Sequence, residues 1–263
     1  RRTGDGPPPL FVDYYVCRGF LRGGVGDEWP FASMAEDGIS ALCINSAPYR
    51  LDAIERYGIG LSAVQSVIDL LASKGEIDRT RVGMGGLSFG TEVTLWTVMK
   101  SDLLAAASVT SPMMSRNWYL FASMKGDAFS KPSKEFWQLG APDETPERWR
   151  ILSPVANLDN IKAPILMQMP EQEYVMALDY AIPLIREHHA DLYVFPNEPH
   201  QKFQPKHKLA AYERNIDWFR FWLQGYEDPD PAKHAQYAHW REMKMALSSR
   251  PAHSADKADH QNP

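Results

Sequence analysis

The sequence predicts an α/β fold with a mostly parallel central sheet and helices on both faces. Short runs rich in β-branched and aromatic residues alternate with longer segments whose apolar residues recur at helical spacing. The short runs are continuously apolar, as in strands that are buried on both faces. Strands separated by helices are joined by right-handed crossovers, and such connections make neighbouring strands parallel.

The expected elements follow one another from residue 10 to residue 225. The expected strands are 10–16, 39–45, 80–86, 105–111, 163–169 and 191–195. The expected helices are 52–75, 89–100, 173–189 and 208–225, and glycine ends the first and the last of them. These elements predict a single domain over residues 10–224.

Three segments fall outside the alternation. Residues 112–160, rich in Trp, Met, Lys and Pro, are expected to form a helical excursion or cap. Residues 1–9 are interpreted as an upstream remnant or linker. Residues 225–263 are expected to be a polar tail, in which only "YAHWREMKMAL" has apolar residues at helical spacing. The last part of this tail is expected to be disordered.

Composition and charge exclude several classes of partner. The 263 residues are 44% hydrophobic and 23% charged, with a formal net charge of -5, so no basic surface for nucleic acid is expected. No apolar run reaches the ~20 residues that span a bilayer, so no membrane partner is expected. The start, "RRTGDGPPPL", lacks a methionine, and we interpret the chain as a fragment for which a cytoplasmic location is favoured. The sequence does not indicate an oligomeric state.

The cysteine and histidine pattern predicts neither a disulfide nor a metal site. Cys17 and Cys43 lie in or beside apolar strand-like runs, where free buried thiols are the favoured interpretation. No pair of histidines has ligand spacing supported by a third residue, so no metal and no cofactor are expected.

The motif that carries chemistry is "GGLSFGTEV", residues 85–93. It contains G-x-S-x-G, with Ser88 between Gly86 and Gly90, and it lies between an expected strand and an expected helix. A simple turn is the alternative, but this position is the one that a nucleophile elbow requires. The glycines leave space for a sharp reversal that exposes the serine hydroxyl. Ser88 is therefore the predicted nucleophile.

A serine hydroxyl needs a base and an acid that orients the base. His200 follows the last expected strand in "FPNEPHQKF" and is the predicted base. The acid should follow strand 163–169, where Glu171 and Glu173 are both candidates. We favour Glu171 because it is nearer the strand end, whereas Glu173 is expected to open the next helix. The chain order serine, acid, histidine predicts the α/β-hydrolase fold.

With these residues placed, the chain resembles the catalytic domain of the prolyl oligopeptidase family of serine peptidases over residues 8–224. The resemblance rests on "PLFVDYYV", on the helix before "RVGMGGLSFG", on "SPMMSRNWYLF" and on the His200 loop. Within the family the chain is most similar to the lasso-peptide isopeptidases, through "GLSFGTEV", a glutamate acid and the segment that follows His200.

The resemblance implies further roles for particular residues. It implies an oxyanion hole made of the Phe89 N–H and the Tyr15 hydroxyl, with Tyr14 on the opposite face of the strand. It also implies that Trp118 and Tyr119 surround a substrate pocket, and that a β-propeller domain precedes residue 1 in a longer chain. For Tyr15, Trp118 and Tyr119 the alternative interpretation is an aromatic side chain that only packs against its neighbours.

The sequence also departs from the family pattern. Thr91 replaces a further glycine after the elbow, and the segment before the acid has Gln168 and Met169 where the family has a His-Gly dipeptide. Glutamates follow in place of the family's aspartate. Specificity for proline is therefore not expected.

The predicted function is that of a serine hydrolase that cleaves an amide or isopeptide bond of a peptide through an acyl-enzyme. In the narrower interpretation the substrate is a lasso peptide, whose macrolactam ring the enzyme opens. A carboxylesterase, a thioesterase or a general oligopeptidase would use the same residues. A non-catalytic domain that binds a peptide is the alternative from another class, and the intact order of serine, acid and histidine argues against it.

Overall fold

The computed structural model describes residues 6–17, 28–48 and 52–249. In this part of the chain six strands form one sheet in the order β2-β1-β3-β4-β5-β6, and every neighbouring pair is parallel. The strands are β1 (Leu10–Tyr15), β2 (Ser40–Asn45), β3 (Val82–Gly86), β4 (Ala106–Val109), β5 (Ile165–Pro170) and β6 (Ala190–Phe195). The predicted parallel sheet is confirmed.

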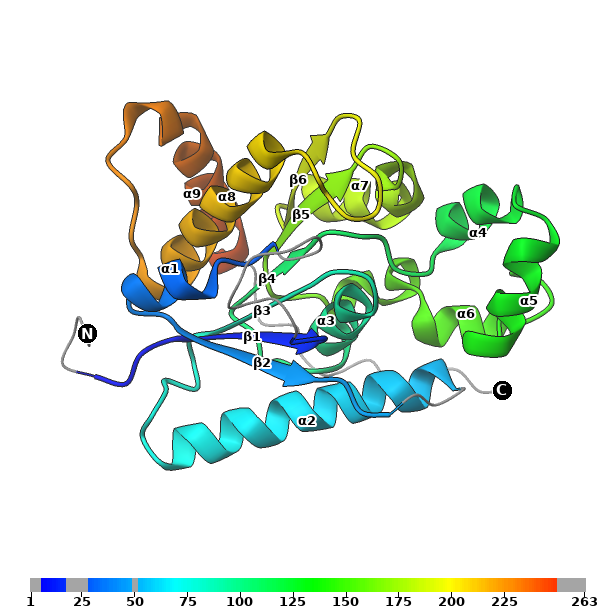
Figure 1. The fold of residues 1–263 in the computed structure, drawn as a ribbon, viewed down its shortest axis with the longest axis horizontal. Helices are drawn as coiled ribbons and strands as arrows, with labels where there is room; N and C mark the ends of the chain where they lie inside the picture. Colours follow the sequence, from blue (N-terminus) through cyan, green and yellow to red (C-terminus); the bar gives the residue numbers. More distant parts are fainter. Residues whose placement is uncertain (1–5, 18–27, 49–51, 250–263) are drawn as a thin grey trace, which may run out of the picture.

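Helices cover both faces of this sheet (Figure 1). One face carries α2 (Ala53–Ser73), α3 (Phe89–Lys100) and α7 (Leu178–Arg186), and the other carries α1 (Phe31–Glu36), α8 (Pro205–Gln224) and α9 (His234–Ser248). Along β1, Val12 and Tyr14 join the first core and Phe11 joins the second, because successive side chains of a strand point to opposite faces. Both faces are apolar for this reason.

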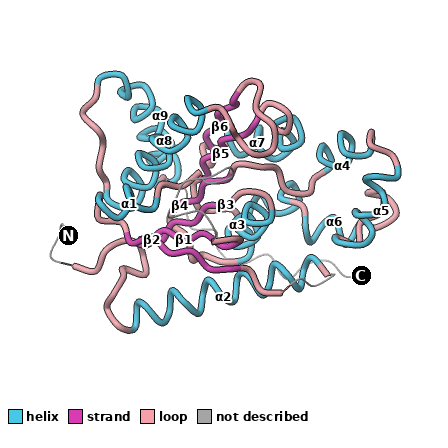
Figure 2. Tube along the Cα trace, in the orientation of Figure 1, coloured by secondary structure: helices cyan, strands magenta, loops and turns pink. Residues whose placement is uncertain are grey.

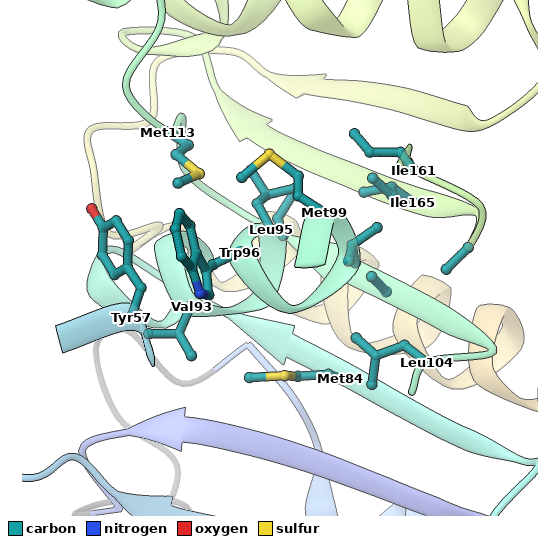
Figure 3. Packing of buried hydrophobic residues seen from close by; sticks show 14 of the residues in the cluster. Tyr57, Met84, Val93, Leu95, Trp96, Met99, Leu104, Met113, Ile161 and Ile165 are labelled. Carbon is teal, nitrogen blue, oxygen red and sulfur yellow. The ribbon is translucent and has the colours of Figure 1, made fainter. Parts of the chain in front are cut away.

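The helix α3 lies at the centre of the first core. Its buried side chains, including Val93, Leu95, Trp96 and Met99, surround its axis rather than forming one stripe (Figure 3). A helix that is apolar on all sides is buried on all sides. The first turn of α3 is thereby held rigidly against the sheet.

Residues 112–160 contain three α-helices and one 3₁₀ segment between β4 and β5. The helices α4 (Arg116–Ser123), α5 (Asp127–Phe136) and α6 (Pro146–Leu152) lie beyond one end of the sheet (Figure 2). The arrows of β1 and β2 end on this same side (Figure 1). The 3₁₀ segment η1 (Pro154–Asn160) instead packs against α3. The carboxyl ends of the strands therefore face the excursion.

The chain after residue 224 is more ordered than we predicted. Residues 234–248 form α9, whose Tyr237, Trp240 and Met243 are fully buried against Trp218 and Phe221 of α8. The polar residues of this stretch lie on the exposed side of the helix, and the buried residues are the apolar positions of "YAHWREMKMAL". Residues 250–263, predicted to be disordered, lie outside the described residues.

The prediction of free thiols was wrong. Cys17 and Cys43 form a disulfide with their Cα atoms 5.7 Å apart. Cys43 lies on β2 and Cys17 follows β1, and these strands are neighbours in the sheet. The sequence separation of 26 residues gave no sign of this proximity. Disulfides persist in oxidising compartments, so the bond does not support the cytoplasmic location that we favoured.

Candidate active site

The G-x-S-x-G motif forms a sharp turn between β3 and α3. Ser88 has φ 57° and ψ -123°, a conformation that costs a non-glycine residue about 1–3 kcal/mol. A Cβ on Gly86 would lie 2.0 Å from the carbonyl carbon of Gly90, closer than any packing allows. A Cβ on Gly90 would lie 3.2 Å from the carbonyl oxygen of Tyr14. The two glycines therefore permit the strained turn that holds the serine between strand and helix.

The turn is further held by hydroxyl groups. Thr91 Oγ1 donates a hydrogen bond to the Gly86 carbonyl at 2.5 Å, and the Ser88 N–H donates to Ser111 Oγ at 2.8 Å. Thr91, which replaces the glycine of the family pattern, is fully buried. Its side chain therefore closes the turn that the smaller residue would leave open.

The N–H of Phe89 lies at the N-terminus of α3. Phe89 is the first residue of α3, and the first N–H groups of a helix have no acceptor within the helix. Within the described residues no hydrogen bond from this N–H is found. The helix dipole adds partial positive charge at the same place.

The two tyrosines at the end of β1 both contact Phe89 but differ in burial. Tyr14 is buried in the core and its hydroxyl accepts a hydrogen bond from the Ala47 N–H at 3.1 Å. Tyr15 is the last residue of the strand and is half-buried, with its ring edge-on to Phe89 at a centroid distance of 5.8 Å. Tyr15 therefore lies beside the first residue of α3, where the resemblance requires the second oxyanion donor.

The structure pairs His200 with Glu173. His200 Nδ1 lies 2.8 Å from Glu173 Oε1. The hydrogen bond to Glu173 raises the pKa of His200 above its ordinary value, and burial opposes this effect. With Nδ1 held by the carboxylate, the second ring nitrogen, Nε2, is the one available for proton transfer.

Our preference for Glu171 was wrong. Glu171 is exposed, and its Oε2 accepts a hydrogen bond from the Asn197 N–H at 2.6 Å. The Glu171 N–H donates to the Phe195 carbonyl, so the ladder between β5 and β6 continues one residue past the end of β5. The chain turns only after this point, and the residue that then faces His200 is Glu173. Proximity to the strand end was the wrong criterion.

The pair and the serine lie at the same edge of the sheet. Ser88 follows β3, Glu173 follows β5 and His200 follows β6, and the carboxyl ends of parallel strands meet at one edge. Burial raises the pKa of the Glu92 carboxyl group, and His200 lies close enough to oppose this effect. Glu92 is one turn along α3 from Ser88, and its N–H donates to the Ser88 carbonyl.

The loop that carries His200 is tied down by buried charges that the sequence pattern did not reveal. Lys202 Nζ lies 2.8 Å and 3.1 Å from the two carboxylate oxygens of Glu28, and both side chains are buried. Glu198 is also buried and accepts hydrogen bonds from the N–H groups of Phe203 and Gln204. The sequence "NEPHQK" gave no signal of this burial, because its two charged residues, Glu198 and Lys202, are of types that are usually exposed in loops.

Trp118 and Tyr119 belong to an aromatic cluster of the excursion. The Trp118 ring packs against Phe129 and Trp137, and the Tyr119 ring against Phe129 and Trp149, with centroid distances of 5.2–5.7 Å. Packing within the excursion accounts for both residues. Their role in a substrate pocket stays a prediction.

Among the described residues, no group of three histidine, cysteine, aspartate or glutamate side chains could hold a metal ion. None of the described helices combines the length and the apolar character that crossing a bilayer requires.

Comparison with known proteins places the chain in a family. Residues 60–226, more than half of the chain, match the family model of the prolyl oligopeptidase family. The chain belongs to the prolyl oligopeptidase family. It is also 35% identical to the lasso peptide isopeptidase AtxE2 of Asticcacaulis excentricus over 93% of its own length, and it spans 37% of the length of that protein.

Solved structures of other proteins share the fold. AtxE2 without ligand superposes with a TM-score of 0.82 and 33% identity, covering 91% of this chain and 39% of that one. A serine-to-alanine variant of AtxE2 with astexin3-dC4 bound superposes with a TM-score of 0.79 and 32% identity, covering 94% of this chain and 40% of that one. The acylaminoacyl peptidase of Pyrococcus horikoshii superposes with a TM-score of 0.63 and 20% identity, covering 88% of this chain and 40% of that one. At this identity the likeness shows the fold alone. The fold is the α/β-hydrolase fold that the order of the site residues predicted.

Proposed function

We propose that this domain is the catalytic part of a serine peptidase that hydrolyses the isopeptide bond of a lasso peptide and so opens its macrolactam ring. The strained turn at Ser88, between Gly86 and Gly90, carries the reaction class, because such a turn presents a hydroxyl for acyl transfer. The 35% identity to AtxE2 over 93% of the chain supports the substrate class.

In the first half of the reaction, Ser88 Oγ attacks the carbonyl carbon of the amide. His200 Nε2 accepts the hydroxyl proton, and Glu173 stabilises the imidazolium that forms. The N–H of Phe89 and the hydroxyl of Tyr15 donate hydrogen bonds to the oxyanion. Each such donor contributes about 3–4 kcal/mol of transition-state stabilisation in comparable sites.

In the second half, the tetrahedral intermediate collapses and the C–N bond breaks. The leaving amine, which is the N-terminal amine of the ring, takes the proton from His200. Water then attacks the ester of Ser88, again with His200 as base, and the acid side chain of the substrate is released. The net change is the addition of one water to the peptide.

Mass spectrometry of a lasso peptide incubated with the protein tests the proposal. The expected product has gained the mass of one water molecule and is linear, and the Ser88→Ala protein forms it about 10⁶-fold more slowly. A fluorophosphonate probe should label the parent protein and not this variant.

Other outcomes would replace the proposal. Turnover of aryl esters or thioesters with no peptide cleaved would favour an esterase or thioesterase. Cleavage of linear peptides but not of the ring would favour a general oligopeptidase. Absence of probe labelling in a folded protein would indicate a non-catalytic binding domain.

A further inference from the structure

A small pocket lies between the carboxyl ends of β1 and β2 and the start of α2. It has a volume of about 230 Å³. Its lining includes Tyr15 and Phe89, together with Ser46 from the β2 end and Arg56 and Ile59 from α2. Among the described residues of its lining, the pocket thus combines aromatic and aliphatic walls with one cationic side chain.

This pocket flanks the reacting centre, and its Arg56 contacts the excursion through Phe136 of α5. It shares Tyr15 and Phe89 with the proposed oxyanion hole, and neither Trp118 nor Tyr119 lines it. A substrate whose carbonyl oxygen is held by those two donors must place a neighbouring group close to this pocket. The pocket is therefore within reach of a residue beside the scissile bond.

Arg56 is held in place at the pocket wall. Its guanidinium carbon lies 5.3 Å from the centre of the Phe89 ring, a cation–π distance. Its Nη2 donates a hydrogen bond to the Phe136 carbonyl of α5 at 3.0 Å. A guanidinium is a planar fork of donors that matches a carboxylate, and a fork fixed by its surroundings loses less entropy on binding.

A buried acidic group, Glu92, lies close enough to interact electrostatically with Arg56. Glu92 is buried and accepts a hydrogen bond from the Tyr57 hydroxyl at 2.5 Å, with Trp137 Nε1 at 3.5 Å. Burial raises the pKa of Glu92, and Arg56 opposes this effect. Burial disfavours the charged form of this carboxyl group, so Glu92 attracts the guanidinium less strongly than a carboxylate that stays fully ionised would.

We propose that the pocket is a subsite for a carboxylate-bearing residue of the peptide substrate next to the scissile bond, with Arg56 binding the carboxylate. Ile59 and the Phe89 ring contact the methylene groups of that residue, and Ser46 lies at the polar rim. The subsite rests on the proposed function, since it assumes a peptide bound at the oxyanion hole.

Matched pairs of fluorescence-quenched peptides test the subsite. Within each pair one peptide has Glu and the other Gln at a position within two residues of the scissile bond, and the position is varied between pairs. At one position the parent protein should prefer the Glu peptide about tenfold in kcat/KM. The Arg56→Gln protein should reduce this ratio to near one, and Arg56→Lys should give an intermediate ratio because it keeps the charge and loses the fork.

Arg79→Gln is the matched control. Arg79 pairs with Asp69 in the last part of α2, about 20 Å along the helix from Arg56 at 1.5 Å per residue. The Arg79→Gln substitution also removes one arginine charge, and it should leave the ratio of kcat/KM between the Glu and Gln peptides unchanged. No preference for Glu at any position, or a preference that survives Arg56→Gln, would refute the subsite.

Binding to the Ser88→Ala protein separates this proposal from the proposed function. Fluorescence anisotropy with the same peptides requires no turnover. If the parent cleaves no peptide but Ser88→Ala binds Glu peptides more tightly than Gln peptides, and Arg56→Gln in that background removes the difference, the subsite stands and the peptidase function fails. Cleavage without acid preference would support the peptidase function and refute the subsite. Circular dichroism of the Arg56 variants checks that each is folded.

Discussion

The elbow around Ser88 and the Glu173–His200 pair are built in different ways. The elbow is a backbone structure within five residues, in which Gly86 and Gly90 leave space that no side chain could share. The pair joins two loops 27 residues apart in sequence, and it depends on which carboxylate reaches the imidazole. The elbow can therefore be recognised from a local pattern, whereas the pair depends on how far each strand extends before the chain turns.

The largest effect should come from the backbone of the elbow. Gly86→Ala places a methyl group 2.0 Å from the Gly90 carbonyl carbon, and the backbone of α3 cannot retreat because its first turn is buried. We expect loss of soluble folded protein or a destabilisation above 4–5 kcal/mol, the range that marks severe strain. Urea unfolding followed by circular dichroism measures this effect.

The matched control for that change lies on α2. A Cβ on Gly58 would have nothing within 4 Å, so Gly58→Ala should stabilise the helix by about 0.5–1 kcal/mol. A Gly86→Ala protein with the stability of the parent would show that the turn is held by side chains instead of by the backbone.

The acid should show the second-largest effect. Glu173→Gln removes the charge that stabilises the His200 imidazolium and should lower kcat about 10³–10⁴-fold. Glu171→Gln keeps an oxygen that can accept the Asn197 N–H and should change kcat less than about threefold. Single-turnover kinetics with one peptide substrate measures both. Equal losses in the two variants would contradict the assignment of Glu173.

The pH profile sharpens the same comparison. His200 must be neutral to accept a proton, and Glu173 raises its pKa above the ordinary 6.5, so the acid limb of kcat/KM should lie above that pH. Removing the charge of Glu173 should move this limb to lower pH. For stability the sign is opposite, since a raised histidine pKa stabilises the fold below 6.5 and this contribution is lost as the pH rises through the folded pKa.

The same division between local and long-range information runs through the rest of the molecule. The span predicted for the helix after Ser88, residues 89–100, coincides with that of α3, because strand, turn and helix patterns are local. The Cys17–Cys43 disulfide was missed because only the sheet order makes β1 and β2 neighbours. The apolar periodicity of 237–247 was visible in the sequence, but it did not show that α9 packs against α8. In each case the missing information was the identity of the tertiary neighbour.

The smallest effect in this comparison should come from the buried Lys202–Glu28 pair that anchors the histidine loop. It should appear as a loss in the free energy of unfolding. Lys202→Met leaves the buried carboxylate of Glu28 without its partner, and breaking a buried pair in this way costs about 3–5 kcal/mol. Burial already raises the pKa of Glu28, so part of this cost is relieved by protonation of the carboxyl group. Urea unfolding at neutral pH measures the loss.

Two further variants decide how this anchor acts. Lys206→Met removes an exposed charge from the same segment and should change stability by less than about 0.5 kcal/mol. The double variant Lys202→Met, Glu28→Leu removes both charges and should recover most of the lost stability, because a buried ion pair is close to neutral against apolar residues of similar size. If the double variant is folded and stable but its acid limb has moved, the pair positions His200 electrostatically as well as holding the loop. If Lys202→Met is as stable as the parent, side-chain contacts do not anchor this loop, and the contrast with the backbone-built elbow fails.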